Sequence, residues 1–199
     1  MDRVSLGIRT HSGWAALIAL TGPLELPRLL QRTRLVLADP KLAGSKQPYH
    51  AAERFPYFEA ERMIDRFRQN SNALATSALR EACSPFADYS ITGCCLLLSS
   101  ARPLPELKSI LASHALIHTA EGEFFRDAIR QACEASGIPV LAMREREIEA
   151  EAQRRTGLAG GAIENHLKAL GKACGPPWRQ DEKLATLAAW AALERIPKP

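Results

Sequence analysis

The alternation of apolar and polar residues in the first forty positions predicts three β-strands. Residues 4–8 and 14–20 are short apolar runs, and residues 10–13 (THSG) between them have turn chemistry, so the two runs predict a β-hairpin. After a break at residues 21–23, residues 29–38 alternate between apolar and polar side chains and predict a third strand. Strands joined by short turns pair in antiparallel fashion, so we expect three antiparallel strands at the start of the chain.

From residue 40 onwards the pattern changes to an alternation of helices and strands. Residues 40–56 have mixed polarity and predict a long loop, which is where functional residues are often found. Residues 89–99 (YSITGCCLLLS) form the most continuous apolar run and predict a buried strand, and residues 138–143 predict a fifth strand. Apolar residues at helical spacing, or helix start and stop signals, predict helices over residues 58–83, 106–112, 120–136, 145–155, 163–170 and 181–193.

The predicted order of elements is β-β-β-α-β-α-α-β-α-α-α. Three antiparallel strands followed by helix–strand alternation favour an α/β fold, with a mixed five-stranded sheet and helices on both faces. No internal repeat or domain boundary interrupts the chain, so residues 1–199 are interpreted as one domain.

The composition places the chain among ordinary globular proteins, with 46% hydrophobic and 24% charged residues. A formal charge of +4 and a pI near 8.9 are compatible with nucleic-acid binding but do not require it. None of the five cysteines is in a C-x-x-C pair, so we interpret all of them as reduced thiols. The sequence contains no signal-peptide pattern and no apolar stretch long enough for a membrane span, so we expect a cytoplasmic protein that does not engage membranes.

Three segments resemble the RuvC-type Holliday junction resolvases of the ribonuclease H-like superfamily. Residues 6–13 (LGIRTHSG) resemble their first strand and turn, and also the first phosphate loop of actin-type sugar kinases. Residues 125–143 (FRDAIRQACEASGIPVLAM) resemble their helix, glycine and fifth strand, and residues 163–193 resemble their C-terminal helices. The resemblance implies a three-layer α/β/α ribonuclease H-like fold.

The resemblance also implies a set of carboxylates, and this chain departs from it. Such nucleases place an Asp in the first strand, an acid at the end of the fourth strand and one or two acids at the start of the last helix. These carboxylates hold two divalent cations. The corresponding positions here are Arg9, the acid-free residues 98–100 (LSS), and Asp181 with Glu182. A guanidinium repels a cation, so two-metal nuclease or kinase chemistry is not expected.

The first functional hypothesis is therefore a degenerate ribonuclease H-like protein that binds nucleic acid, a nucleotide or a protein partner. In this hypothesis Arg9, His11, Asp181 and Lys183 line the former active site, and the site offers hydrogen-bond donors to phosphate oxygens. His11 can equally be an exposed histidine in a turn. A second copy of the chain is a further possible partner, because the alanine-rich last helix could pack against it or could close the core of its own chain.

The second hypothesis is a hydrolase with different catalytic groups. His114, His118 and Glu121 would share one face of a helix, and H-x-x-x-H with a carboxylate can bind a transition metal or pair a general base with an orienting acid. We assign the catalytic roles to His118 and Glu121. The competing interpretation is a solvated helix start capped by Thr119, since Gly122 argues against a continuous helix.

Two other histidines complete the candidates. His50 lies in the long predicted loop next to Glu53 and is a candidate ligand-binding residue, whereas His166 is expected on a helix surface. The sequence assigns no definite metal ligand and no cofactor, and it leaves open whether the protein is an enzyme.

Overall fold

A computed structural model describes residues 2–99 and 103–193 of the chain. Its five strands form one mixed sheet in the order β3-β2-β1-β4-β5. The antiparallel part joins β1 (Arg3–His11), β2 (Trp14–Thr21) and β3 (Arg28–Val36), and β4 (Ser90–Leu98) and β5 (Val140–Arg144) extend the sheet in parallel with β1. The carboxyl ends of β1, β4 and β5 therefore meet at one edge of the sheet.

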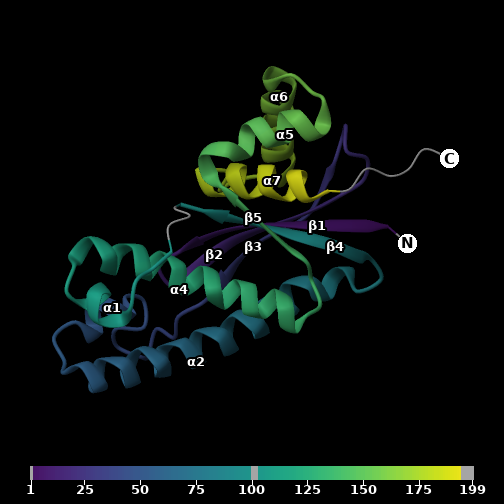
Figure 1. Cartoon of the computed structure of the whole chain (residues 1–199). Coiled ribbons are helices and arrows are strands. Elements are labelled where there is room, and N and C mark those ends of the chain that lie inside the picture. The colour runs from purple at the N-terminus through teal and green to yellow at the C-terminus, as the bar shows by residue number, and fades with distance from the viewer. Residues whose placement is uncertain (1, 100–102, 194–199) are drawn as a thin grey trace.

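Helices cover both faces of this sheet, which gives three layers (Figure 1). One layer contains the long helices α2 (Tyr57–Cys83) and α4 (His114–Ala135), with the short helices α1 (Pro48–Ala52) and α3 (Leu107–Leu111) packed against α2 and α4. The opposite layer contains the helices α5 (Ile148–Thr156), α6 (Gly160–Cys174) and α7 (Gln180–Ala192). The described chain thus has the α/β architecture with a mixed five-stranded sheet that the sequence predicted.

The alternation of side chains along β1 determines which layer each residue faces. Val4, Leu6 and Ile8 belong to the core on the α2/α4 side. Ser5 and Gly7 point to the other side, where Ser5 Oγ donates a 2.7 Å hydrogen bond to the carbonyl oxygen of Ala189 in α7. Because the side-chain period of a strand is two, Arg9 and His11 also face α7.

Helix α7 packs directly on β1 because the residues between them are small. A Cβ atom built on Gly7 would lie only 1.9 Å from the carbonyl oxygen of Ala185 and 2.3 Å from the backbone nitrogen of Ala189. Glycine is therefore required for this approach. The contact brings the N-terminus of α7 next to the carboxyl end of β1, and it also means that α7 closes the core of its own chain. Of the two alternatives for this helix, closure of its own core is the one that the structure shows.

The ends of several elements differ from the predictions. The helix predicted over residues 120–136 begins at His114, because Ser113 caps it and Gly122 does not interrupt it; Thr119 is therefore not the N-cap. The predicted loop at residues 40–56 contains helix α1. Residues 145–147 form a 3-10 turn before α5 instead of the start of a helix. Hydrogen-bonded caps and tertiary contacts determine these limits, and the apolar pattern does not encode them.

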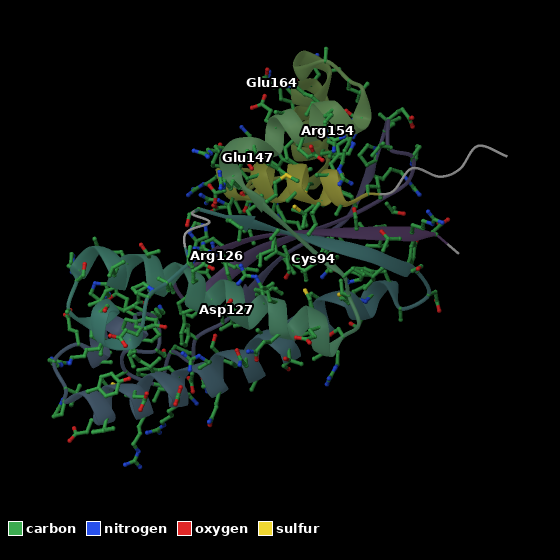
Figure 2. The ribbon with its side chains drawn as sticks, in the orientation of Figure 1. Cys94, Arg126, Asp127, Glu147, Arg154 and Glu164 are labelled. Atoms are coloured by element: carbon green, nitrogen blue, oxygen red, sulfur yellow. The ribbon has the colours of Figure 1, made fainter. Side chains whose placement is uncertain are left out.

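Many ionised groups lie on the outer surfaces of the two helical layers. Figure 2 shows Asp127 on α4 and Arg154 and Glu164 on the layer of α5 and α6, while Cys94 lies in the sheet. All five cysteines are free thiols, which agrees with their interpretation as reduced, and Cys94, Cys95 and Cys133 are fully buried. Within the described residues, no helix combines the length and the apolar character needed to cross a bilayer.

Candidate functional site at the carboxyl ends of the parallel strands

The polar residues that follow β1, β4 and β5 come together at one edge of the sheet. Arg9 and His11 end β1, Ser99 follows β4, and Glu145 follows β5. Asp181 joins them from the first turn of α7, whose N-cap is Arg179. The carboxyl ends of parallel strands are a common place for ligand sites in α/β proteins.

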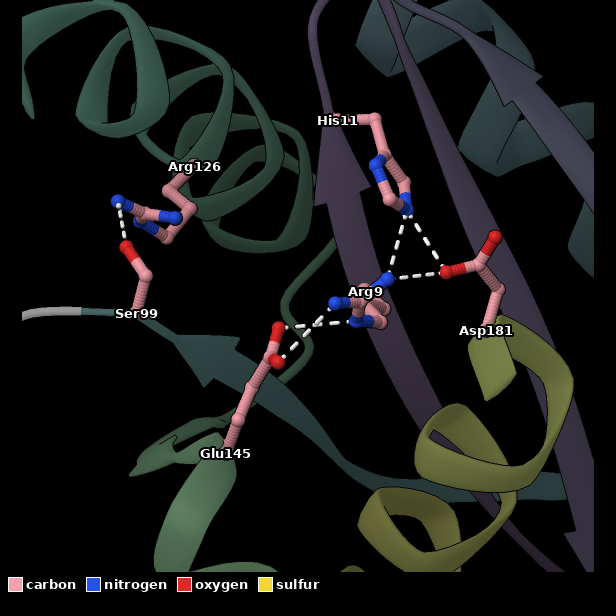
Figure 3. A network of polar contacts seen from close by, with 6 residues as sticks. All are labelled: Arg9, His11, Ser99, Arg126, Glu145 and Asp181. Atoms are coloured by element: carbon pink, nitrogen blue, oxygen red, sulfur yellow. Dashed lines mark hydrogen bonds and ion pairs between the residues drawn. The ribbon is translucent and has the colours of Figure 1, made fainter. Parts of the chain in front are cut away.

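Arg9 lies at the centre of this group, between two carboxylates (Figure 3). Its Nε and Nη2 atoms donate to the two carboxylate oxygens of Glu145 over 2.9 and 3.1 Å, which is a bidentate ion pair. Its Nη1 atom donates to Asp181 Oδ1. The guanidinium therefore bridges the end of β5 and the start of α7, which are far apart in the sequence.

The charges of the two acids and of Arg9 stabilise one another. Partial burial acts to lower the pKa of Arg9, but the hydrogen bonds and charges of Glu145 and Asp181 outweigh it and raise that pKa. Partial burial acts to raise the pKa of Asp181, but the hydrogen bonds and charges of His11 and Arg9 hold it below its usual value. The one positive and two negative charges of Arg9, Glu145 and Asp181 give this trio a formal charge of −1.

His11 extends the network towards the β1–β2 turn. Its Nε2 atom lies 2.8 Å from Asp181 Oδ1 and 3.0 Å from Arg9 Nη1. Its ring stacks on Trp14 with ring centroids 4.3 Å apart, and the guanidinium carbon of Arg34 lies 3.6 Å from the Trp14 ring centroid. His11 is thus a half-buried residue at the end of a strand, not an exposed histidine in a turn.

A second arginine comes from helix α4. Arg126 is 6% exposed at its side chain, bonds Ser99 Oγ over 3.0 Å and pairs with Glu123 at 2.9 Å (Figure 3 shows the Ser99 bond). A Cβ atom at position 122 would lie 2.8 Å from the Arg126 guanidinium, so Gly122 provides the space in which this side chain lies against the helix. Ser99 thus binds an arginine at a position where the resemblance implies an acid; Ser100 is outside the described residues.

A third cluster contains His50 of α1 and Glu121 of α4. Glu121 Oε1 accepts hydrogen bonds from the backbone nitrogen atoms of Tyr49 and His50 over 2.9 and 3.1 Å, and it lies 3.2 Å from His50 Nδ1. Burial raises the pKa of Glu121, although the hydrogen bonds from His50 and Tyr49 act against this effect. His118 points instead at His114, with 3.0 Å between their Nε2 atoms. The predicted pair of His118 and Glu121 is therefore replaced by His50 and Glu121.

One pocket of about 300 Å³ joins these groups. Its lining includes Arg9, His11, His50, Ser99, His118, Glu121, Arg126 and Glu145. Of the predicted site residues, Asp181 contacts the pocket residues Arg9 and His11. Lys183 does not line the pocket; it is exposed on α7, and its charge acts on Glu164 of α6. His166 is not at the predicted surface either, because it is half-buried and bonds the carbonyl oxygen of Pro27 over 2.8 Å.

Sequence reasoning missed Glu145 and the role of Arg126. Glu145 belongs to the run Arg144-Glu145-Arg146-Glu147, whose alternating charges are typical of a solvated helix surface. The signal that could have identified it is its position directly after a parallel strand.

Comparisons with known proteins identify solved structures that share this architecture. No family model matches the chain, and no curated protein matches it by sequence. The Thermus thermophilus RuvC structure in complex with a Holliday junction substrate is similar, with a TM-score of 0.55 and 13% identity over 95% of this chain and 91% of that one. A second T. thermophilus RuvC structure gives a TM-score of 0.52 and 11% identity over 94% and 92% of the two chains. The chain therefore has the RuvC-like, ribonuclease H-like fold that the sequence segments predicted.

Proposed function

We propose that this protein binds nucleic acid across the carboxyl edge of its sheet and does not cut it by two-metal catalysis. The observation that supports this proposal most strongly is the placement of Arg9 between Glu145 and Asp181. The guanidinium occupies the region where the resemblance implies a cation, and it pairs with the two carboxylates that a cation would need.

The donor set argues against two divalent cations at this edge. A Mg²⁺ ion needs about six oxygen ligands in near-octahedral geometry, and a two-metal centre needs carboxylates that are free to bridge the ions. Here both carboxylate oxygens of Glu145 accept hydrogen bonds from Arg9, and Asp181 Oδ1 contacts both Arg9 and His11. A cation would have to displace an arginine that the fold holds in place.

The basic residues around the pocket support an interaction with phosphates. Arg34 lies over Trp14, next to His11; Lys46 precedes the pocket residue Gln47; and Arg146 follows Glu145. All three are exposed. The pocket itself contains two arginines and two glutamates, so these outer cations carry most of the attraction, and binding is expected to be weak and salt-sensitive.

A fluorescence anisotropy titration with a labelled four-way DNA junction, duplex DNA and single-stranded RNA tests this proposal. For the two DNA probes, the logarithm of the association constant should fall with the logarithm of salt concentration with a slope of about −3, because each of the three outer cations contributes about −0.9. The double variant Lys46→Glu/Arg146→Glu should weaken binding strongly and bring the slope to about −1. Arg80→Glu, an exposed change on α2 that does not line the pocket, is the control and should have little effect.

The proposal fails if no nucleic acid binds at low salt, or if the double variant binds as tightly as the parent. A parallel titration with nucleotides separates a nucleotide-binding protein from a polymer-binding one. Absence of affinity for both would leave a protein as the partner.

A second candidate function is hydrolysis, because His50, His118 and Glu121 line the same pocket as Arg9. An imidazole whose Nδ1 is held by a carboxylate is a common arrangement for a general base. A screen with phosphodiester and carboxylic ester substrates tests this candidate. An activity that is unchanged in both His50→Ala and His118→Ala would rule out the assignment to this group of residues.

A further inference from the structure

Three imidazoles from two helices gather at one side of the pocket. His50 comes from α1, and His114 and His118 come from the first turns of α4. Each offers one ring nitrogen, and these three atoms all lie within 4.8 Å of one another. The ring centroids are 4.5 Å apart for His114 and His118, 4.8 Å for His50 and His118, and 5.4 Å for His50 and His114.

The local sequence explains why the three rings meet. His114 and His118 are four residues apart, so they project from the same face of α4. Ser113 caps the helix at this end, which keeps both histidines within the regular helix. Helix α1 starts with Pro48 and is anchored on α4 by Tyr49, whose ring meets Phe124 edge-on with centroids 6.2 Å apart.

Glu121 holds His50 in an orientation that suits a metal ligand. Its Oε1 atom lies 3.2 Å from His50 Nδ1, so a proton on Nδ1 leaves the lone pair of Nε2 free. Histidines that bind metals commonly donate their second ring nitrogen to a carboxylate in this way. The other oxygen, Oε2, is buried and has no hydrogen-bond partner among the described residues, and the Glu121 side chain is only 6% exposed. A bound cation would balance this carboxylate.

We propose that His50, His114 and His118 form a site for a single borderline transition-metal ion, of which Zn²⁺ is the representative. In a tetrahedral zinc site with Zn–N bonds of 2.0–2.1 Å, ligand nitrogens lie about 3.3 Å apart. The 3.0 Å between the Nε2 atoms of His114 and His118 is close to this value. Since both of these residues are exposed, rotation of their side chains can close the longer separations.

Three protein nitrogens leave the fourth position of a tetrahedral ion for water or a ligand, as in catalytic zinc sites. That position is open to the pocket, because His50 and His118 are among its lining residues. Mg²⁺ is excluded as the preferred ion, since it favours oxygen ligands. The site is independent of the Arg9 network and does not rest on nucleic-acid binding.

Isothermal titration of the tag-free full-length protein with Zn²⁺ and with Mg²⁺ tests the proposal. One Zn²⁺ per chain is expected, with no binding of Mg²⁺ at these residues. His118→Ala should weaken Zn²⁺ binding at least about 100-fold, and Glu121→Gln should weaken it about 10- to 100-fold, because the second hydrogen-bonding shell is worth that much. The control His166→Gln removes an imidazole outside the cluster and should leave the affinity unchanged.

Titration with Co²⁺ gives a second readout, because four-coordinate cobalt has a strong visible absorption that His118→Ala should abolish. If His118→Ala does not fold, as judged by circular dichroism, His114→Ala replaces it. Absence of stoichiometric Zn²⁺ binding would overturn the proposal, and so would binding that the cluster variants and His166→Gln weaken equally. Nucleic-acid binding can persist or fail independently of either result.

Discussion

Replacement of Arg9 by methionine removes the positive charge that joins β1, β5 and α7. Methionine has a similar length and no charge, so Glu145 and Asp181 lose their shared partner while the space remains filled. The variant therefore measures how much the structure depends on a cation at this position.

The size of the effect follows from the exposure of the three side chains, which is 20% for Arg9, 30% for Glu145 and 25% for Asp181. Ion pairs on the surface contribute up to about 1 kcal/mol, and breaking a buried pair costs about 3–5 kcal/mol. Two pairs of intermediate exposure contribute about 1–1.5 kcal/mol each on this scale. Arg9→Met should therefore lower the free energy of unfolding by about 2–3 kcal/mol.

Urea unfolding followed by circular dichroism at neutral pH measures this difference. The matched control is Arg146→Met, because Arg146 is 74% exposed and lies 3.7 Å from Glu147. It should change stability by less than about 0.5 kcal/mol. Equal effects of the two variants would refute the reasoning, because they would mean that Arg9 contributes no more than a solvated surface arginine.

Two further predictions concern packing and pH. Gly7→Ala should destabilise the protein by about 3 kcal/mol in urea unfolding, because its Cβ would lie 1.9 Å from the carbonyl oxygen of Ala185 and α7 would have to move. Gly93→Ala is the control, since its nearest contact is an ordinary 3.4 Å; similar losses would contradict the close packing. Hydrogen bonds from Arg154 and Arg155 lower the pKa of Glu151 to about 2. The stability that the ionised Glu151 contributes is fully present above its unfolded pKa of about 4.3 and is lost as the pH falls towards 2. Glu151→Gln should therefore make the pH dependence of the urea midpoint shallower over that range. An unchanged pH profile would contradict this prediction.

The order of elements was predictable because each strand and helix carries its own apolar pattern. The hairpin of β1 and β2 and the buried strand β4 follow from local sequence alone. The start of α4 was predicted six residues too late, because Thr119 was interpreted as the N-cap and Gly122 as evidence against a continuous helix from His114. In the fold this glycine makes room for Arg126, which is a tertiary effect that the pattern does not contain.

The candidate site was predictable only in part. Arg9 and Asp181 were identified through the resemblance to the resolvases, which supplies the three-dimensional arrangement of the strand ends. Glu145 was missed, because its proximity to Arg9 depends on the pairing of β5 with β4 and of β4 with β1. The contact between Glu121 and His50 joins positions 71 residues apart, and no local spacing encodes it.

Incubation of a labelled four-way DNA junction with the protein and Mg²⁺ or Mn²⁺, followed by native and denaturing gels, tests the central claim most directly. The proposal puts the Arg9 guanidinium in the region where the resemblance implies a cation, so the junction should be retarded on the native gel and remain intact on the denaturing gel. Metal-dependent strand cleavage that disappears in the Asp181→Asn variant would contradict the account.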